Sequence, residues 1–534
     1  MVIVCSLVRG LRPSRAEVVL GGIFAVVSVA VLGGLLSRGR VLAGAESQVG
    51  ADQMQYLSWI VSAGQNGSIL SWWSIPPQMS SNFFHPGFLI SGLLNRAGVD
   101  ALLSYQLWKL IAIPAVVIAF VAYVRRLVPQ GRPRTAALAL ALFGLSPVGA
   151  VLGWNALKKG FSGQVEFAAG ELFAPSWLWG YMMTAIAVAL LIWGLLLAET
   201  ATKPGASRIT KAALPATAFF CSWLQPWQGA ELLGAVLLTD VLISGRGLRG
   251  LLAVGRGRAG LVVAGVLPLA YYFWLGTSES VWKIAASANN AVPLWSVGVW
   301  LAVLLPWFPA IRCYFKRPEG WQPTALRIVP VLMMAEYGLI SITRAGTFPF
   351  HAVQGMTLFL AALSVEGALL MRDRAWWGRH LPLAVVAVLV MCVPGTLHRL
   401  NLMRLEIHRS AQPYFLEAGE VEALAQLKEE SGPGGVLAPI KAALSVPAHS
   451  QRPVWVGELS WTPDFRERVE RAEKLFKGHL TASQALVLVA ESNARFLYAD
   501  CGHTFDLRTQ LSPQILKVTQ HGCARVYEIR SSAK

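Results

Sequence analysis

The chain has 534 residues, of which 54% are apolar and only 14% are charged, against roughly 25% charged in an average soluble domain. It carries 46 basic and 29 acidic residues, for a formal charge of +17. This composition excludes an ordinary soluble protein and indicates a polytopic membrane protein. We expect no nucleic-acid partner, because the basic residues gather between apolar runs.

Eleven apolar runs approach the roughly 20 residues that cross a hydrocarbon core. They lie near residues 16–36, 102–124, 135–155, 176–198, 212–225, 227–244, 259–276, 294–311, 325–342, 352–371 and 381–397. Loops on one side repeatedly carry Arg or Lys, which places the N-terminus in the cytoplasm by the positive-inside rule. The first run is too long for a signal-peptide core, so we expect it to remain as an anchor in the plasma membrane.

The first outer loop, residues 37–101, is the predicted active-site loop. Asp52 stands in the stretch GADQMQYLSWIVSAG, followed by aromatic-rich segments too short to span a bilayer, which should lie at the membrane interface. A carboxylate near Trp59, Trp72 and Trp73 is a candidate catalytic base. Asp52 could instead cap the following helix, and Glu46 is the alternative acid.

Later outer loops hold candidate donor-binding residues. Arg344 and His351 flank the loop before the tenth run, and an Arg suits a phosphate because its fork binds two oxygens. Arg344 could also extend to lipid headgroups. The outer pair Lys158 and Lys159 could bind the donor phosphate or anionic lipid.

Candidate sugar or acceptor contacts combine amide, imidazole and aromatic side chains. The predicted set is Tyr56, His85, Gln225, Trp227, Gln228 and Gln354. Trp227 could equally belong to an interfacial aromatic belt. Glu166 and Glu171 could supply a second acid or bind a metal, but no metal site is predicted. Glu336, inside the ninth run, needs a partner, and Lys109 is a candidate.

The composition changes after the last run, which predicts a membrane domain over residues 1–397 and an extracytoplasmic α/β domain over 398–534. Helices are expected at 417–430, 441–446 and 464–476, and strands at 434–439, 453–458, 494–500 and 523–529, with a helix or strand at 482–490 and a helix before the last strand. Six cysteines without CxxC spacing disfavour a zinc or redox motif. Whether Cys501 and Cys523 form a disulfide stays open.

The first 130 residues resemble the GT-C superfamily of lipid-linked-sugar-dependent glycosyltransferases, which includes protein O-mannosyltransferases and aminoarabinose transferases. The match follows an order of elements: Asp52 and Tyr56 in the first loop, a helix over 53–63, the turn at Pro76 and Pro77, the motif FHPGFLISGLL at 84–94, and YVRRLVP at 123–129. SWLQPWQGAELL at 222–233, TFPFHAVQGMTLFLAAL at 347–363 and the segment WVGELSWTP also resemble members of this superfamily. Relatives often have two adjacent acids or HPP, whereas Gln53 and Gly87 stand here, which favours a single-base mechanism.

The resemblance implies an inverting glycosyltransferase that moves a sugar from a polyprenyl-phosphate donor to an acceptor hydroxyl at the outer membrane face. The implied partners are the lipid-linked donor, membrane lipid, and a glycan, lipid or protein acceptor. No further cofactor is predicted, and the sequence leaves open whether the reaction uses a divalent metal. The alternatives are a transporter or flippase for a lipid-linked glycan, a polymerase or ligase that uses lipid diphosphates, and a non-catalytic assembly protein.

Overall fold

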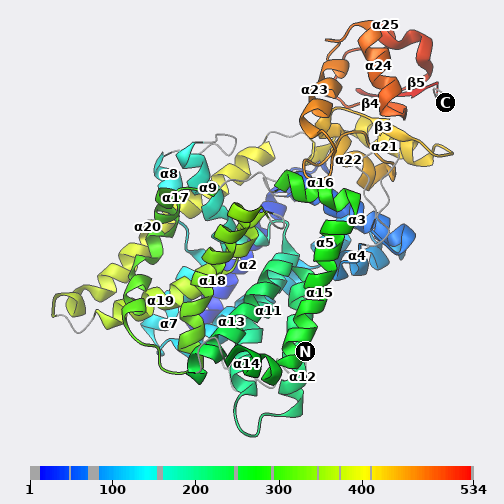
Figure 1. Ribbon diagram of the computed structural model, residues 1–534. Helices are drawn as coiled ribbons and strands as arrows, with labels where there is room; N and C mark the ends of the chain where they lie inside the picture. Colours follow the sequence, from blue (N-terminus) through cyan, green and yellow to red (C-terminus); the bar gives the residue numbers. More distant parts are fainter. Residues whose placement is uncertain are drawn as a thin grey trace. The chain divides into compact units, whose positions relative to one another are not determined.

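The computed structural model is mainly helical and describes residues 13–46, 50–69, 83–152, 160–245, 250–289, 294–344, 348–371, 375–408 and 412–530 (Figure 1). The chain divides into two compact units. The first comprises residues 1–30, 108–273 and 292–402, and the second comprises residues 31–107, 274–291 and 403–534. Lys158, Lys159, Trp72, Trp73, Pro76 and Pro77 lie outside the described residues.

Within the described ranges, nine helical segments are long and apolar enough to cross a membrane. They are α2 (Arg15–Leu36), α5 (Ala101–Gln106) with α6 (Lys109–Leu127), α11 (Met182–Ala201), α13 (Pro226–Ser244), α15 (Ala259–Ser278), α17 (Val297–Leu304) with η2 (Leu305–Phe315), α18 (Trp321–Thr343), η3 (Pro349–Val353) with α19 (Met356–Leu370), and residues Leu383–Leu405 of α20 (Ala375–His408). Each corresponds to one of the predicted runs, which confirms the polytopic membrane fold.

The two other predicted runs form shorter helices. α7 (Arg132–Phe143) ends before Gly144, where a Cβ would come within 2.5 Å of the Trp307 ring. A separate helix, α8 (Val148–Leu152), starts after Pro147. α12 (Arg208–Leu224) has 17 residues and ends before the Gln225–Pro226 step, because the residue before a proline disfavours the helical conformation.

The first unit is a helical bundle in which α11 packs against α6, α12 and α13, and α13 packs against α18 (Figure 1). In the apolar stretch of α11, 78% of the residues are buried, and in that of η3 with α19 the share is 83%. These segments therefore form the interior of the bundle. In the apolar stretch of Leu383–Leu405, only 17% of the residues are buried, as expected of a helix that faces lipid. Three short helices, α9 (Phe161–Leu172), α10 (Ala174–Trp177) and α14 (Leu251–Gly257), complete the unit.

Four arginines of the loops predicted to be cytoplasmic form ion pairs with acids of neighbouring helices. The pairs are Arg125–Glu17, Arg126–Glu199, Arg258–Asp240 and Arg327–Glu366. The arginines of three pairs, Arg125, Arg258 and Arg327, are largely buried, and the acid offsets the cost of placing each of them close to the hydrocarbon, whereas Arg126 is exposed. The basic residues therefore act as helix-to-helix connections as well as orientation signals.

The second unit joins the first loop to the C-terminal region. It contains α3 (Gly50–Asn66), α4 (Pro86–Arg96), α5 and α16 (Ser280–Asn289). β1 (Val41–Leu42) pairs with β2 (Phe415–Leu416) in an antiparallel ladder, and His449 Nε2 lies 2.8 Å from the backbone oxygen of Ala43. Strands far apart in sequence thus tie the start of the first loop to the C-terminal region.

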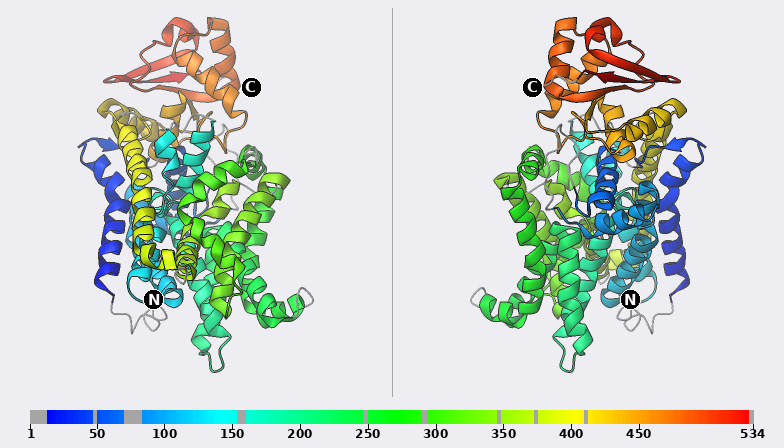
Figure 2. Two further views of the ribbon diagram at one scale, coloured as in Figure 1. Left: turned by 90° about the vertical axis from the view of Figure 1, so that its left-hand side faces the viewer. Right: turned by 90° about the vertical axis from the view of Figure 1, so that its right-hand side faces the viewer.

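The C-terminal region contains a four-stranded sheet in the order β3-β4-β6-β5 (Figure 2). The strands are β3 (Gly435–Leu437), β4 (Ala494–Ala499), β5 (Ile515–His521) and β6 (Ala524–Ile529), and only the β3–β4 pair is parallel. The helices are α21 (Ala418–Glu429), α22 (Ile440–Ser450), α23 (Phe465–Phe476), α24 (Ala482–Ser492), α25 (Arg508–Leu511) and η4 (Ser512–Gln514). Cys501 and Cys523 form a disulfide.

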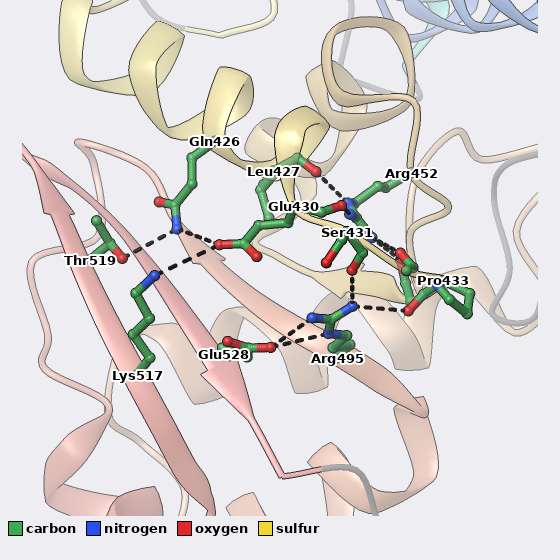
Figure 3. Close-up of polar contacts among 12 residues, drawn as sticks. Gln426, Leu427, Glu430, Ser431, Pro433, Arg452, Arg495, Lys517, Thr519 and Glu528 are labelled. Atoms are coloured by element: carbon green, nitrogen blue, oxygen red, sulfur yellow. Dashed lines mark hydrogen bonds and ion pairs between the residues drawn. The ribbon is translucent and has the colours of Figure 1, made fainter.

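Two arginines hold the turn that connects α21 to β3, residues 431–434. The Arg452 guanidinium donates to the backbone oxygens of Leu427, Glu430 and Gly434, and the Arg495 guanidinium donates to those of Ser431 and Pro433 as well as to the Glu528 carboxylate (Figure 3). These bonds satisfy carbonyl groups that the end of a helix leaves without partners.

Two details of the C-terminal region differ from the prediction. Residues 453–458 form only an isolated bridge, Val436 to Val454, so the predicted strand there is wrong. β5 was not predicted, because it is an edge strand with exposed polar residues and lacks the alternation of a half-buried strand. The 482–490 segment, left open between helix and strand, is helical.

Candidate active site

Asp52 lies in the first turn of α3 and is half-buried. It is the third residue of the helix, which begins at Gly50. The positive end of the helix dipole favours the ionised form of a carboxylate at this position. Gly50 begins the helix where a Cβ would come within 2.9 Å of both Ala45 and Pro413, which explains why a small residue precedes Asp52.

A row of aromatic side chains follows Asp52 along the same face of α3. Tyr56 is one turn and Trp59 two turns further on, and side chains at these spacings share a helix face. The Tyr56 ring lies 5.0 Å from Phe88 and 5.9 Å from Tyr105 between centroids. Asp52 therefore stands at the end of an apolar, aromatic surface of the kind that stacks on a sugar or a lipid.

The motif FHPGFLISGLL forms the start of α4 and its crossing with α3. His85 precedes the helix and Pro86 occupies its first turn, where a missing N–H costs nothing. The His85 ring lies 4.4 Å from Phe88. Gly92 and Gly64 meet at the crossing, since a Cβ on Gly92 would lie 2.6 Å from the Cβ of Ala63. The motif thus packs α4 onto the helix that bears Asp52.

Two further carboxyl groups of the second unit, those of Glu46 and Glu458, are buried. Glu46 is buried, and its side chain accepts from Gln106 Nε2 at 3.1 Å. Its charge and that of Asp52 both act on Tyr105. Glu458, from the segment WVGELSWTP, is also buried, and burial together with the neighbouring Asp52 carboxylate raises the pKa of Glu458 to about 8. Glu458 therefore holds its proton more tightly than an exposed carboxyl group.

The first unit brings together other predicted residues. Gln228, which is fully buried in α13, donates through Nε2 to the backbone oxygens of His351 at 2.9 Å and Gln354 at 3.3 Å. Gln354 Nε2 in turn donates to Glu171 Oε2 at 2.6 Å. Gln228 thus ties the start of α13 to η3. Its amide nitrogen has a structural task that the sequence did not reveal.

Arg399 of α20 joins the same region of the first unit. Its guanidinium lies 3.7 Å from Glu166 Oε1, and Glu171 acts on it electrostatically. Gly170 leaves room for this guanidinium, because a Cβ there would come within 2.6 Å of Arg399 Nη2. Glu166 is therefore explained as the partner of a largely buried arginine. Within the described ranges, no three His, Cys, Asp or Glu side chains are grouped so as to hold a metal ion.

The remaining predicted residues have separate places. Arg344 ends α18 in the left-handed conformation, with φ of 55°, and is exposed. His351 is half-buried with its ring against Phe348, 5.3 Å between centroids. Gln225 donates to Thr184 Oγ1 at 3.1 Å, and Trp227 is half-buried in the first turn of α13. Asp52, Tyr56 and His85 belong to the second unit, and these residues belong to the first.

Sequence reasoning missed two residues and proposed one ion pair that the structure does not contain in the described ranges. Glu458 and Arg399 were not singled out, although a Glu inside a Trp-rich segment and an Arg at the end of an apolar run were visible signals. The proposed Lys109 to Glu336 pair is replaced by other contacts. Lys109 Nζ donates to the backbone oxygen of Ser28 at 3.4 Å, and the charged neighbour of Glu336 is Glu231.

The fold defined by these helices and the C-terminal α/β region is the GT-C fold, which confirms the fold that the resemblance implies. The chain is similar in structure to the aminoarabinose transferase ArnT from Cupriavidus metallidurans bound to undecaprenyl phosphate, with a TM-score of 0.53 and 15% identity over 97% of this chain and 98% of that one. For the apo state of ArnT the TM-score is 0.51, with 14% identity and 96% coverage of both chains.

A more distant similarity is to the archaeal oligosaccharyltransferase AglB from Archaeoglobus fulgidus, in complex with an inhibitory peptide and a dolichol-phosphate. The TM-score is 0.44 with 14% identity, over 96% of this chain and 74% of that one. No protein-family model and no curated protein sequence matches the chain.

Proposed function

We propose that this protein is an inverting glycosyltransferase that moves a sugar from a polyprenyl phosphate to an acceptor hydroxyl at the outer face of the membrane. The observation that carries the proposal is the position of Asp52, a carboxylate in the first turn of α3 at the end of an aromatic face. The similarity to a GT-C protein bound to undecaprenyl phosphate supports a lipid-linked donor.

In the proposed reaction the acceptor oxygen attacks the anomeric carbon of the donor sugar. A bond forms between this oxygen and the carbon as the bond from the carbon to the phosphate oxygen breaks. Asp52 takes the acceptor proton, and the polyprenyl phosphate leaves with the electron pair. Attack from the face opposite the phosphate inverts the anomeric configuration.

The proposed phosphate-binding groups are Arg344, His351, Lys158 and Lys159, which would stabilise the negative charge on the leaving phosphate. Tyr56, His85, Gln225, Trp227, Gln228 and Gln354 are the proposed sugar or acceptor contacts. The position of the half-buried Tyr56 ring, one turn after Asp52 and 5.0 Å from Phe88, supports its proposed contact with the sugar or the acceptor. The side-chain amide nitrogen of Gln228 is engaged by backbone, which leaves its oxygen as the group for a ligand.

The test is a transfer assay on purified, reconstituted protein. A panel of polyprenyl-phosphate sugars is supplied with acceptors, and acceptor-stimulated release of polyprenyl phosphate is measured. Asp52→Asn should lower the release rate by roughly 100-fold or more, because the amide cannot take a proton, while binding of the donor persists. A transporter would instead move the donor without release and would tolerate this change.

Asp100→Asn is the matched control. Asp100 lies in the same loop, is exposed, and caps α5 by accepting from the backbone N–H of Leu103 at 3.1 Å. Asparagine caps helices as well as aspartate does, so this variant should keep the wild-type rate. Equal release by wild type and Asp52→Asn would overturn the proposal, and so would the absence of acceptor-dependent release with every donor.

A further inference from the structure

An apolar groove lies among four segments of the first unit, α7, η2, α19 and α20. It contains about 460 Å³ of space, part of which is open to the surroundings. Its walls are apolar side chains and one serine, and they include Leu140, Pro306, Pro309, Ser364, Ala368 and Ala384. The hydroxyl of Ser364 donates to the backbone oxygen of Trp307 at 3.1 Å. The side chains that line the groove therefore offer a polar ligand no free partner, and such a space excludes water.

The sequence of η2 explains the shape of the groove. η2 is a 3-10 helix in the second part of a membrane-spanning segment, although runs of this helix longer than about four residues are uncommon. Pro306 occupies its first turn and Pro309 its interior, and neither has an N–H for an α-helical hydrogen bond. Side chains three residues apart are eclipsed in a 3-10 helix, so Pro306, Pro309 and Arg312 form one row. The row of prolines that lines the groove therefore ends at a guanidinium.

α19 lies directly against this row. A Cβ on Gly367 would clash with the backbone oxygen of Pro309 and would lie 3.5 Å from the Cβ of Arg312. Gly367 stands between Ser364 and Ala368, which both line the groove. Arg312 is therefore adjacent to the groove in space as well as in the row of η2.

Positive charge is in excess at this end of the groove. Three basic residues are exposed here: Arg312, Lys316 and Arg317. Within the described ranges, no carboxylate forms an ion pair with any of the three. Glu319 follows them and is exposed, and Glu366 of α19 is paired with Arg327. Three cations and one unpaired acid leave a local excess of positive charge.

The two features together define the chemistry of a ligand. The walls belong largely to segments that cross the membrane, so hydrocarbon is the material available to fill the groove. The basic residues at its end favour an anion, and basic pockets between membrane helices are suited to anionic lipid headgroups. From Ser364 to Met371 the α19 wall extends for about 10 Å, at 1.5 Å per residue, which is room for part of one acyl chain.

We propose that the groove binds an anionic phospholipid, with one acyl chain among η2, α19 and α20 and the phosphate at Arg312. The loop that carries Arg312 is predicted to be cytoplasmic, so this lipid belongs to the inner leaflet. The proposed sugar donor is expected at the outer face. The inference therefore concerns a second lipid site and does not depend on the proposed function.

The first experiment is native mass spectrometry of the purified, delipidated full chain. Phosphatidylglycerol and phosphatidylcholine with identical acyl chains are titrated, and the former should bind at least roughly 5-fold more tightly, since each basic residue near a lipid headgroup contributes about 1 kcal/mol. Arg312→Gln should weaken phosphatidylglycerol binding by roughly 5-fold and leave phosphatidylcholine binding unchanged, while Arg312→Lys should keep the preference. Arg208→Gln, at an exposed arginine that begins α12, is the control for loss of one positive charge.

The second experiment locates the acyl chain. A phosphatidylglycerol with a photoreactive diazirine on its acyl chain is bound to the wild type, and the crosslinked peptides should contain residues 364–371 or 384–388. Ala384→Phe should suppress this crosslink because the larger ring fills the groove. Val386→Phe is the matched control, since Val386 lies on the same helix, is exposed and does not line the groove. Thermal unfolding of each variant checks its folding.

Three results would overturn the inference. The first is equal binding of the two lipids by the wild type, and the second is wild-type affinity of Arg312→Gln for phosphatidylglycerol. The third is crosslinking of the wild type only outside the groove, a result that needs no variant. Tighter binding of a polyprenyl phosphate than of phosphatidylglycerol at the Arg312-dependent site would also contradict the assignment, because it would give the groove to the lipid carrier.

Discussion

His503 of the C-terminal region lies between two carboxylates. Its Nδ1 is hydrogen-bonded to Asp500, and its Nε2 lies 3.5 Å from Glu473. Burial by itself lowers the pKa of His503, but the two carboxylates outweigh it and raise the pKa to about 9. The hydrogen bond from His503 in turn lowers the pKa of Glu473 to about 2, against the effect of burial.

The stability of the chain should therefore fall as the pH rises from about 6.5 to about 9. The folded state holds the His503 proton more tightly than the unfolded state, so its contribution is complete below the unfolded pKa and disappears above the folded one. The contribution of Glu473 to stability has the opposite pH dependence. It is complete above about pH 4.5 and disappears as the pH falls toward about 2. Thermal unfolding of the full chain against pH measures both.

The free energy of unfolding of the His503→Gln variant should fall by about 2 kcal/mol less than that of the wild type between pH 6.5 and 9. His479→Gln, at an exposed histidine on the loop after α23, should leave it in place. The interpretation is wrong if the His503→Gln curve keeps the wild-type slope between pH 6.5 and 9.

At the scale of elements, the α3–α4 crossing positions the candidate base. The glycines Gly64 and Gly92 let the two helices approach, because a Cβ on either one would lie within 2.9 Å of the other helix. The FHPGFLISGLL motif was read from sequence as part of a family resemblance. Its contacts give it a physical purpose, which is to set the distance between the helix that bears Asp52 and its neighbour.

Gly92→Ala should destabilise the protein by about 1–2 kcal/mol and lower transfer activity. Alanine normally favours a helix by about 1 kcal/mol over glycine, but overpacking costs about 1–3 kcal/mol, and here the clash involves the backbone of Gly64. Gly33→Ala in α2 meets no atom within 4 Å and should be neutral or stabilising. Chemical unfolding of both variants gives the comparison, and a stabilised Gly92→Ala would contradict the account.

At the scale of the whole molecule, the orientation in the membrane follows from the basic loops and from an odd number of spans, which predicts an extracytoplasmic C-terminal region. The Cys501–Cys523 disulfide supports this prediction, because disulfides persist in oxidising compartments. The disulfide was open at the sequence level, since cysteine spacing does not define pairing.

In a Cys5→Ser background, a membrane-impermeant maleimide should label Cys501 and Cys523 in reduced, right-side-out vesicles and not in inverted ones. Both side chains are partly or fully exposed, whereas Cys221, Cys313 and Cys392 are buried. Without prior reduction the labelling should disappear, and so should that of a Cys501→Ser, Cys523→Ser double variant. Equal labelling of the two kinds of vesicle, or labelling only of inverted ones, would refute the predicted orientation.

The amino-acid sequence alone determined the membrane class, nine of the helical segments and the helix that carries Asp52. These features depend on apolar runs and on turn and cap signals, all of which involve residues close together in the sequence. α23, β4 and β6 were predicted for the same reason, and the order of motifs in the first loop was sufficient to indicate the GT-C fold.

Only the tertiary structure decided which distant residues meet. The β1–β2 ladder, the Arg399–Glu166 pair and the contact between the Trp59 and Trp461 rings each join segments more than 200 residues apart. A carboxyl group looks the same in the sequence whether it will face water, a guanidinium or a second carboxylate. The packing of elements sets the surroundings of a carboxyl group and therefore its charge. The burial of Glu458 and the pairing of Arg399 with Glu166 could thus be recognised only in the folded chain.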